Sequence, residues 1–139
     1  MKPAHRIVFL ATLVSVGGLN SLSALGQEIR IIAVDGTRAP GMPAGVTFQP
    51  FGLAGLPSIN AAGQVAFAAS VRGPGVDPEF AIGVWSDRGG DLGPVILPGD
   101  ILPGEPAGTR VYSAAAPYIA GSGNLTWRAQ RRPRTDASN

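Results

Sequence analysis

Cysteine is absent from the sequence, and histidine and lysine each occur once, as His5 and Lys2. The absence of cysteine excludes disulfides, thiolate metal ligands and a cysteine nucleophile. If the first residues are removed after export, the mature chain also lacks histidine and lysine. A Ser-His-Asp triad, a Schiff-base lysine and a P-loop lysine are then excluded, and carboxylate chemistry or an all-oxygen calcium site remains.

The N-terminus has the pattern of a secretory signal peptide. Lys2 and Arg6 precede an apolar run over residues 7–19, and the small residues within 24–26 favour cleavage before Gln27. That run is too short to cross about 30 Å of hydrocarbon as a helix. We therefore expect an N-terminal signal helix. We also expect a mature chain exported to the periplasm, the cell surface or the medium, with no stable membrane anchor after cleavage.

Charge and composition favour a neutral, turn-rich β protein. Removal of residues 1–26 takes Lys2 and Arg6 from the 11 basic residues, and the nine that remain equal the 9 acidic residues. The mature chain is thus formally neutral, and no nucleic-acid partner is predicted. The 20 glycines and 13 prolines oppose long helices, whereas a hydrophobic fraction of 45% allows a buried core.

Two blocks of sequence recur at a spacing of about sixty residues. Residues 40–45 (PGMPAG) match residues 103–108 (PGEPAG) at all positions but one. Further along, residues 57–69 align with residues 117–129, and Trp127 takes the position of Phe67. The ordered succession of both blocks predicts a tandem repeat.

Each unit is predicted to contain about four short antiparallel strands. Asn60 and Gly63 suit the first and fourth positions of a type I turn, and the residues that follow alternate between apolar and small or polar. Further strands are predicted over residues 28–34, 46–51, 81–86, 94–97 and 109–114. Because four strands make one propeller blade, we predict an all-β fold of propeller-blade-like units of about sixty residues, the second incomplete.

The domain organisation follows from these boundaries. We expect a signal peptide over 1–26, a first β unit over 27–96, a partial second unit over 97–129 and a disordered arginine-rich tail over 130–139. The tail contains Arg131, Arg132 and Arg134 and follows Arg128 closely. These arginines could bind phosphates or anionic envelope polymers, although a solvated chain end is the simpler interpretation.

Three motifs occur in a fixed order. Asn-x-x-Gly-x-x-Ala-Phe stands at residues 60–67, Gly-Val-Trp at 83–85 and Gly-Asp-Ile-Leu-Pro-Gly at 99–104. In this order they resemble exported bacterial tandem-repeat proteins with the NxxGxxAF motif, a choice-of-anchor repeat family whose members end in C-terminal sorting anchors. The resemblance covers most of residues 31–129 and implies a repeated β architecture at the cell surface, with no established activity. The motif residues to which it gives a structural role are Asn60, Gly63, Phe67, Trp85, Asp100, Pro103 and Gly104.

The second copy departs from this pattern. Residues 120–127 lack the asparagine and end in Thr126 and Trp127, and no counterpart of the strand over 81–86 follows Ala129. An apolar sorting helix is missing as well. We therefore expect a truncated or degraded family member, or a chain that self-associates through open strand edges.

Candidate functional side chains are few. Asp87, Asp91 and Asp100 could supply oxygen ligands to calcium, but aspartate beside glycine is typical of tight turns, and their spacing matches no calcium loop. No metal site and no cofactor are therefore predicted. Four aromatic residues could stack on sugars, but their alternation is also that of core residues. They are Trp85, Tyr112, Tyr118 and Trp127.

Two classes of function remain open. The first is a non-catalytic exported repeat protein, acting in envelope structure, adhesion or recognition, with a cell-surface polymer or another copy as its partner. The alternative is a carbohydrate-active module that uses two of the carboxylates Asp35, Asp87, Asp91 and Asp100. A retaining enzyme needs such a pair about 5 Å apart, and an inverting enzyme needs roughly 6.5–9.5 Å.

Overall fold

The computed structural model describes residues 29–52 and 55–133. The predicted signal helix over 1–26 and residues 134–139 of the predicted tail lie outside the described residues. Within them the fold is all-β, as predicted, with one short 3-10 helix. The elements are β1 (Thr47–Phe48), β2 (Ser58–Ile59), β3 (Val65–Arg72), η1 (Pro78–Phe80), β4 (Ile82–Ser86), β5 (Gly93–Ile96), β6 (Thr109–Ile119) and β7 (Leu125–Pro133).

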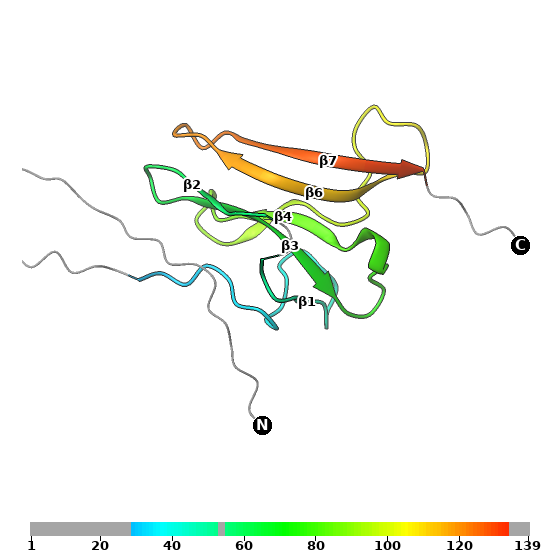
Figure 1. Ribbon diagram of the computed structural model, residues 1–139, viewed down its shortest axis with the longest axis horizontal. Helices are drawn as coiled ribbons and strands as arrows, with labels where there is room; N and C mark the ends of the chain where they lie inside the picture. Colours follow the sequence, from blue (N-terminus) through cyan, green and yellow to red (C-terminus); the bar gives the residue numbers. More distant parts are fainter. Residues whose placement is uncertain (1–28, 53–54, 134–139) are drawn as a thin grey trace, which may run out of the picture.

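The described strands form two antiparallel sheets (Figure 1). In the first sheet β3 is central, because β1 and β2 pair with opposite ends of one of its edges and β4 pairs with the other. β5 then pairs with β4. β6 and β7 form a two-stranded sheet that packs against β3 and β4 through β6.

The first core lies between the first sheet and the segment that precedes β2. Phe67 and Trp85 are cross-strand neighbours on β3 and β4, and both are buried. The Phe48 ring meets Trp85 edge to face, with centroids 5.0 Å apart, and lies 5.9 Å from the Phe67 ring. This aromatic cluster gives β1 and the N-terminal segment an apolar surface to pack on.

The second core lies between the two sheets. Because successive side chains of a strand point to opposite faces, Ala68 and Val84 face away from the first core. They pack instead with Ile96 of β5 and with Val111 and Ala114 of β6, all buried. β3 is therefore covered on both faces. Among the described residues, no helix combines the length and apolar character needed to cross a membrane.

Turn geometry recurs at matching positions of the two sheets. The Gly63 N–H donates to the Asn60 carbonyl at 2.9 Å, and the Gly123 N–H donates to the Ala120 carbonyl at 2.9 Å. Both glycines have a left-handed backbone, with φ of 75° and 81°. The predicted turn at Asn60 is thus confirmed, and the same turn stands sixty positions later.

The loops that lead into β1 and β6 also share backbone hydrogen bonds, at an offset of sixty-three positions. Gly36 N–H donates to Phe48 O at 2.9 Å, and Gly99 N–H donates to Val111 O at 3.1 Å. The same offset relates four further pairs of backbone hydrogen bonds. They are Thr37 N to Val34 O and Asp100 N to Leu97 O, Phe48 N to Thr37 O and Val111 N to Asp100 O, Met42 N to Ala39 O and Glu105 N to Leu102 O, and Val46 N to Pro43 O and Thr109 N to Pro106 O.

Strand register recurs in the same way. Thr47 of β1 pairs with Arg72 of β3, and Arg110 of β6 pairs with Arg132 of β7. Ile59 of β2 pairs with Val65, and Ile119 pairs with Leu125. The positions occupied by β1 and β2 on β3 are therefore occupied on β7 by the single strand β6, whose register shifts twice along its length.

Three sequence predictions are corrected. Residues 29–34 form no strand but only isolated bridges at Arg30 and Val34, and the Arg30 side chain is instead bound to Asp87. The strand predicted over 46–51 shortens to β1, because Pro50 lacks a donor for the ladder. The tail predicted as disordered from residue 130 is part of β7 as far as Pro133. The strands predicted over 81–86, 94–97 and 109–114 are confirmed as β4, β5 and the first half of β6.

Candidate functional site

The four candidate carboxylates have different surroundings. Asp35 is half-buried, and its Oδ1 is buried without a hydrogen-bond partner among the described residues. Asp87 is buried; its Oδ1 accepts the Val65 N–H at 2.6 Å, and its Oδ2 pairs with Arg30 Nη1 at 2.7 Å. Asp100 Oδ2 accepts the Leu97 N–H at 2.8 Å. These two carboxylates therefore stabilise the local backbone by accepting its N–H groups, whereas Asp91 is exposed.

Asp87 joins three segments that lie far apart in the sequence. Arg30, its partner, also donates from Nη2 to the Gly63 carbonyl at 2.7 Å. The N-terminal segment, the β2–β3 turn and the end of β4 are thus tied together. Nothing in the spacing of Arg30 and Asp87 in the sequence indicates this contact. Within residues 29–52 and 55–133, no three His, Cys, Asp or Glu side chains gather as metal ligands would.

Trp85 is a core residue. It is fully buried, and its indole Nε1 donates to the Pro40 carbonyl at 2.9 Å. A Cβ added to Gly41 would come within 2.6 Å of the Pro94 ring, so the loop over 40–45 lies tightly on β4 and β5. The first repeated block therefore accepts the indole hydrogen bond of Trp85 and packs against β5. The second block, at Gly104, has the same left-handed backbone, but no described residue lies within 4 Å of an added Cβ.

The motif residues are brought together in part. Asn60 and Gly63 share one turn, and Phe67 lies opposite Trp85 in the first core. The remaining three, Asp100, Pro103 and Gly104, lie in the loop before β6. Asn60 reaches the second sheet, because its Nδ2 donates to the Ala120 carbonyl at 2.9 Å.

One face of the β6–β7 sheet carries polar and cationic side chains, and we call it the outer face. It consists of exposed residues: Tyr118 of β6 and Thr126, Arg128, Gln130 and Arg132 of β7. The opposite face of β7 bears Leu125, which packs against the second core. Sixty positions before the four β7 residues, β3 bears Ala66 and Ala68, which are buried, Ser70, which is half-buried, and Arg72, which is exposed.

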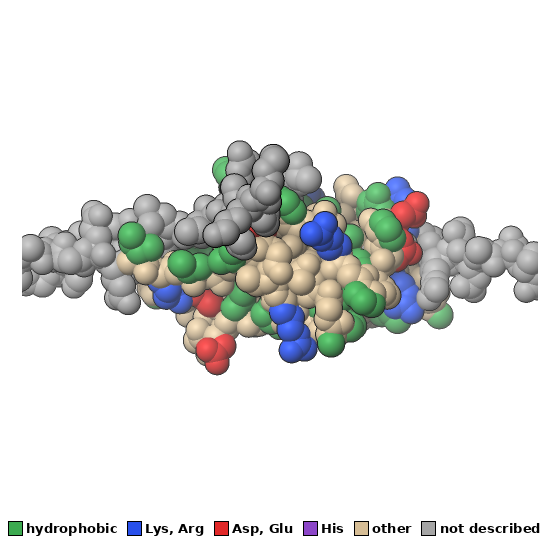
Figure 2. Space-filling view, turned by 90° about the horizontal axis from the view of Figure 1, so that it is seen from below, with side chains coloured by type: hydrophobic (Ala, Val, Ile, Leu, Met, Phe, Trp, Pro, Cys, Tyr) green, Lys and Arg blue, Asp and Glu red, His purple; other side chains and the backbone are tan. Residues whose placement is uncertain are grey.

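Aromatic and ionic contacts organise this face. The Arg132 guanidinium carbon lies 3.9 Å from the centroid of the Tyr112 ring, a distance at which the cation interacts with the ring electrons. On the other face of β7, Arg131 forms an ion pair with Glu105. Trp127 is 36% exposed and Tyr118 62% exposed. On the side of the molecule below β1, by contrast, arginine side chains stand apart from one another (Figure 2).

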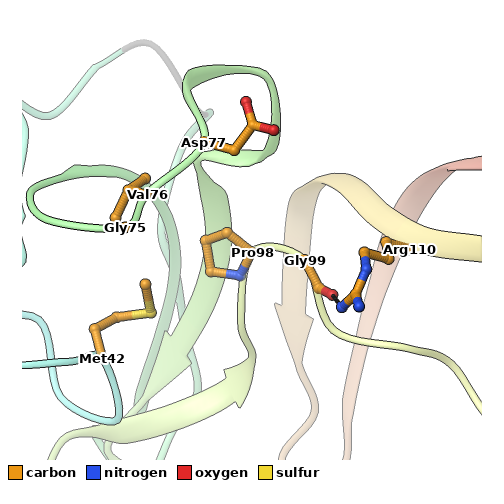
Figure 3. Close-up of a pocket in the computed structure, with 7 residues that line it drawn as sticks. All are labelled: Met42, Gly75, Val76, Asp77, Pro98, Gly99 and Arg110. Carbon is orange, nitrogen blue, oxygen red and sulfur yellow. Dashed lines mark hydrogen bonds between the residues drawn. The ribbon is translucent and has the colours of Figure 1, made fainter. Parts of the chain in front are cut away.

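A cleft of about 290 Å³ lies between the loop after β3 and the start of β6 (Figure 3). Its two charged side chains bind backbone groups: Arg110 Nη1 donates to the Gly99 carbonyl at 2.8 Å, and Asp77 accepts the Glu79 N–H at 3.0 Å. The cleft is therefore a junction between loops whose polar groups serve the fold. Its lining residues are Met42, Gly75, Val76, Asp77, Pro98, Gly99 and Arg110.

Comparisons with known proteins place the chain in a family without defining an activity. No curated protein and no solved structure matches it. A protein-family model, described as a family of unknown function (DUF7453), matches residues 6–139. Because this match spans nearly the whole sequence, the chain belongs to the DUF7453 family.

Proposed function

We propose that the described residues contain two copies of one β module of about sixty residues, and that β6 and β7 are the described part of the second copy. Support comes from the two hairpin turns at an offset of sixty and from the loop hydrogen bonds at an offset of sixty-three. The shared strand registers of β3 and β7 add to this support. Chance likeness among glycine-rich turns would not reproduce strand register.

The modules stack face to face, in the manner of neighbouring propeller blades. The second core joins them through Val84 of the first module and Val111 of the second, both fully buried. The Asn60–Ala120 hydrogen bond and a bond from the Ile119 N–H to Ser58 Oγ, at 3.1 Å, hold the hairpins together at one end. Repeat proteins obtain their stability from interfaces of this kind between neighbouring modules.

We infer a non-catalytic role as an exported protein of the cell envelope, in structure, adhesion or recognition. The observation that carries this inference is the use of the side chains: Asp87 and Asp100 hold backbone N–H groups, and Trp85 fills the core. A group of polar side chains that are exposed to solvent lies on the outer face of the β6–β7 sheet. An exposed, charged sheet face of this kind suits recognition better than enclosure of a small substrate.

Export is tested by expressing the full sequence in a bacterium and determining the N-terminal residue of the product by mass spectrometry. A mature chain that begins at Gln27 and leaves the cytoplasm is expected. A Leu10→Asp variant, which places a charge in the apolar run over 7–19, is the control and should stay in the cytoplasm with Met1 in place. An unprocessed cytoplasmic product from the unaltered sequence contradicts the proposal.

Recognition is tested with the exported chain and isolated cell-envelope fractions from the same cells. Retention on an envelope polymer that is lost in an Arg128→Ala, Arg132→Ala double variant is expected, with Arg88→Ala as a matched exposed control. Salt should weaken the retention, because exposed charges are screened. Turnover of a polysaccharide by the purified chain would favour the carbohydrate-active alternative instead.

A further inference from the structure

Among the described residues, the edge of β7 that faces away from β6 pairs with no other strand. In Figure 1, β7 runs along the margin of the molecule, and its ladder in the described residues is with β6 alone. In the first module the equivalent strand, β3, pairs on its other edge with β4, where Phe67 lies opposite Trp85 and Ala68 opposite Val84. An open edge presents unpaired backbone donors and acceptors to solvent.

The surroundings of matching side chains in the two modules agree with a missing strand beside β7. Phe67 is 1% exposed, beside Trp85 of β4 and against the rings of Phe48 and Phe51, whereas Trp127, sixty positions later in β7, is 36% exposed. A Cβ on Gly41 would collide with Pro94 of β5, whereas one on Gly104 would meet no described residue within 4 Å. No described strand of the second module thus takes the place that β4 and β5 take beside the first.

The two faces of β7 specify the chemistry of a strand that would fill this edge. One face presents Trp127 and Ala129, and the other presents Arg128 and Gln130. Because directly opposite residues of antiparallel strands interact, an apolar side chain is favoured opposite Trp127 and an acidic one opposite Arg128. Antiparallel pairing of β7 with the β7 of a second copy, centred on Arg128, would place two arginines opposite each other, which is unfavourable.

We propose that the edge of β7 over residues 126–130 binds an extended segment of a partner polypeptide by antiparallel strand addition. The segment carries an aromatic or apolar residue opposite Trp127 and an acidic residue opposite Arg128. Backbone hydrogen bonds supply affinity, and the alternating side chains supply specificity. This inference rests on the proposed equivalence of β3 and β7.

The test uses a fluorescently labelled peptide with the β4 sequence, residues 81–87, in two forms that differ at one position. The Val84→Glu form places an acid opposite Arg128, and the Val84→Lys form places a base there. Fluorescence anisotropy with the purified chain should show the Glu form binding at least about fivefold more tightly than the Lys form. An Arg128→Glu variant of the chain should reverse this preference, with its tryptophan emission unchanged as the sign that it is folded.

A third peptide separates strand pairing from attraction to charge. N-methylation of the Val84→Glu peptide at alternate backbone nitrogens keeps its charge but removes donors from the ladder, and binding should fall to that of the Lys form or below. Undiminished binding of the methylated peptide, or equal affinity of the first two, overturns the proposal. Self-association of the chain that blocks peptide binding overturns it in favour of a second copy. None of these results bears on processing at Gln27, so this inference and the proposed function can fail separately.

Discussion

The Asn60 side chain donates from Nδ2 to the backbone carbonyl of Ala120 at 2.9 Å, and the two residues hold the same position in turns sixty residues apart. Asn60 Oδ1 also accepts the N–H groups of Ala62 and Gln64, at 3.1 and 3.0 Å. One side chain therefore closes its own hairpin and fastens the next one. The alanine at position 120 has no group with which to do the same.

Replacement of Asn60 by alanine should lower the free energy of unfolding by about 1–2 kcal/mol, because backbone groups of both hairpins lose a partner. Urea denaturation followed by tryptophan fluorescence measures the change. Asn124→Ala is the matched control: this residue is exposed, and the variant should stay within about 0.5 kcal/mol of the parent. Equal effects at the two positions would show that the contact between hairpins contributes nothing.

Asp87→Ala should destabilise the chain by about 2–3 kcal/mol, since the Val65 N–H is left without its acceptor in a buried position. The half-exposed Arg30 guanidinium retains water, which limits the loss from the ion pair. Asp91→Ala, at an exposed position, should change stability by less than about 0.5 kcal/mol. A double-mutant cycle with Arg30→Met measures the contribution of the Arg30–Asp87 ion pair. A coupling energy near zero would mean that this ion pair does not stabilise the fold.

Matched glycine substitutions test the equivalence of the two hairpins. Gly63→Ala and Gly123→Ala each force a side chain into a left-handed backbone and should each cost about 1–2 kcal/mol. Thermal unfolding of both variants gives the comparison. A loss at Gly63 with no loss at Gly123 would indicate that only the first hairpin is held in this conformation, and it would count against two copies of one module.

The position of Gly83 in β4 allows a sharper test of packing. An added Cβ would meet the Ile96 carbonyl oxygen at 2.7 Å and the Pro98 ring at 2.9 Å, and backbone cannot give way cheaply. Gly83→Ala should therefore cost about 1–3 kcal/mol. Gly93 in β5 has nothing within 4 Å of an added Cβ, and Gly93→Ala should be neutral or stabilising. Calorimetry on both variants distinguishes crowding from a general intolerance of substitution in this sheet.

The sequence was informative where a local rule governs the structure. The asparagine and glycine of the Asn60–Gly63 turn specify a bulged hairpin, and the alternation after it predicts β3 with its apolar face on the first core. The strands over 81–86 and 94–97 are bounded by glycine and proline and were placed within one residue of their observed ends. Turn chemistry and alternation act over a few residues, so they can be recognised without the fold.

The sequence did not predict the structure where contacts between distant segments determine it. Residues 29–34 are rich in β-branched residues, as strands are, but Arg30 binds Asp87 and holds that segment outside the ladders. The arginines from 131 onward suggest a solvated end, yet Glu105 and the Tyr112 ring bind Arg131 and Arg132 and extend β7. Both partners are brought close only by tertiary structure, which overrides local preference.

The two tryptophans offer a spectroscopic test of the open edge of β7. Trp85 is fully buried with its indole N–H bonded to Pro40 O, whereas Trp127 is 36% exposed. Trp85→Phe should cost about 2 kcal/mol and leave red-shifted emission that acrylamide quenches readily, because Trp127 alone remains. Trp127→Phe should cost less than about 1 kcal/mol and leave blue-shifted, protected emission. Emission from Trp127 as protected as that from Trp85 would mean that the edge is already covered in solution, and sedimentation would then show whether a second copy covers it.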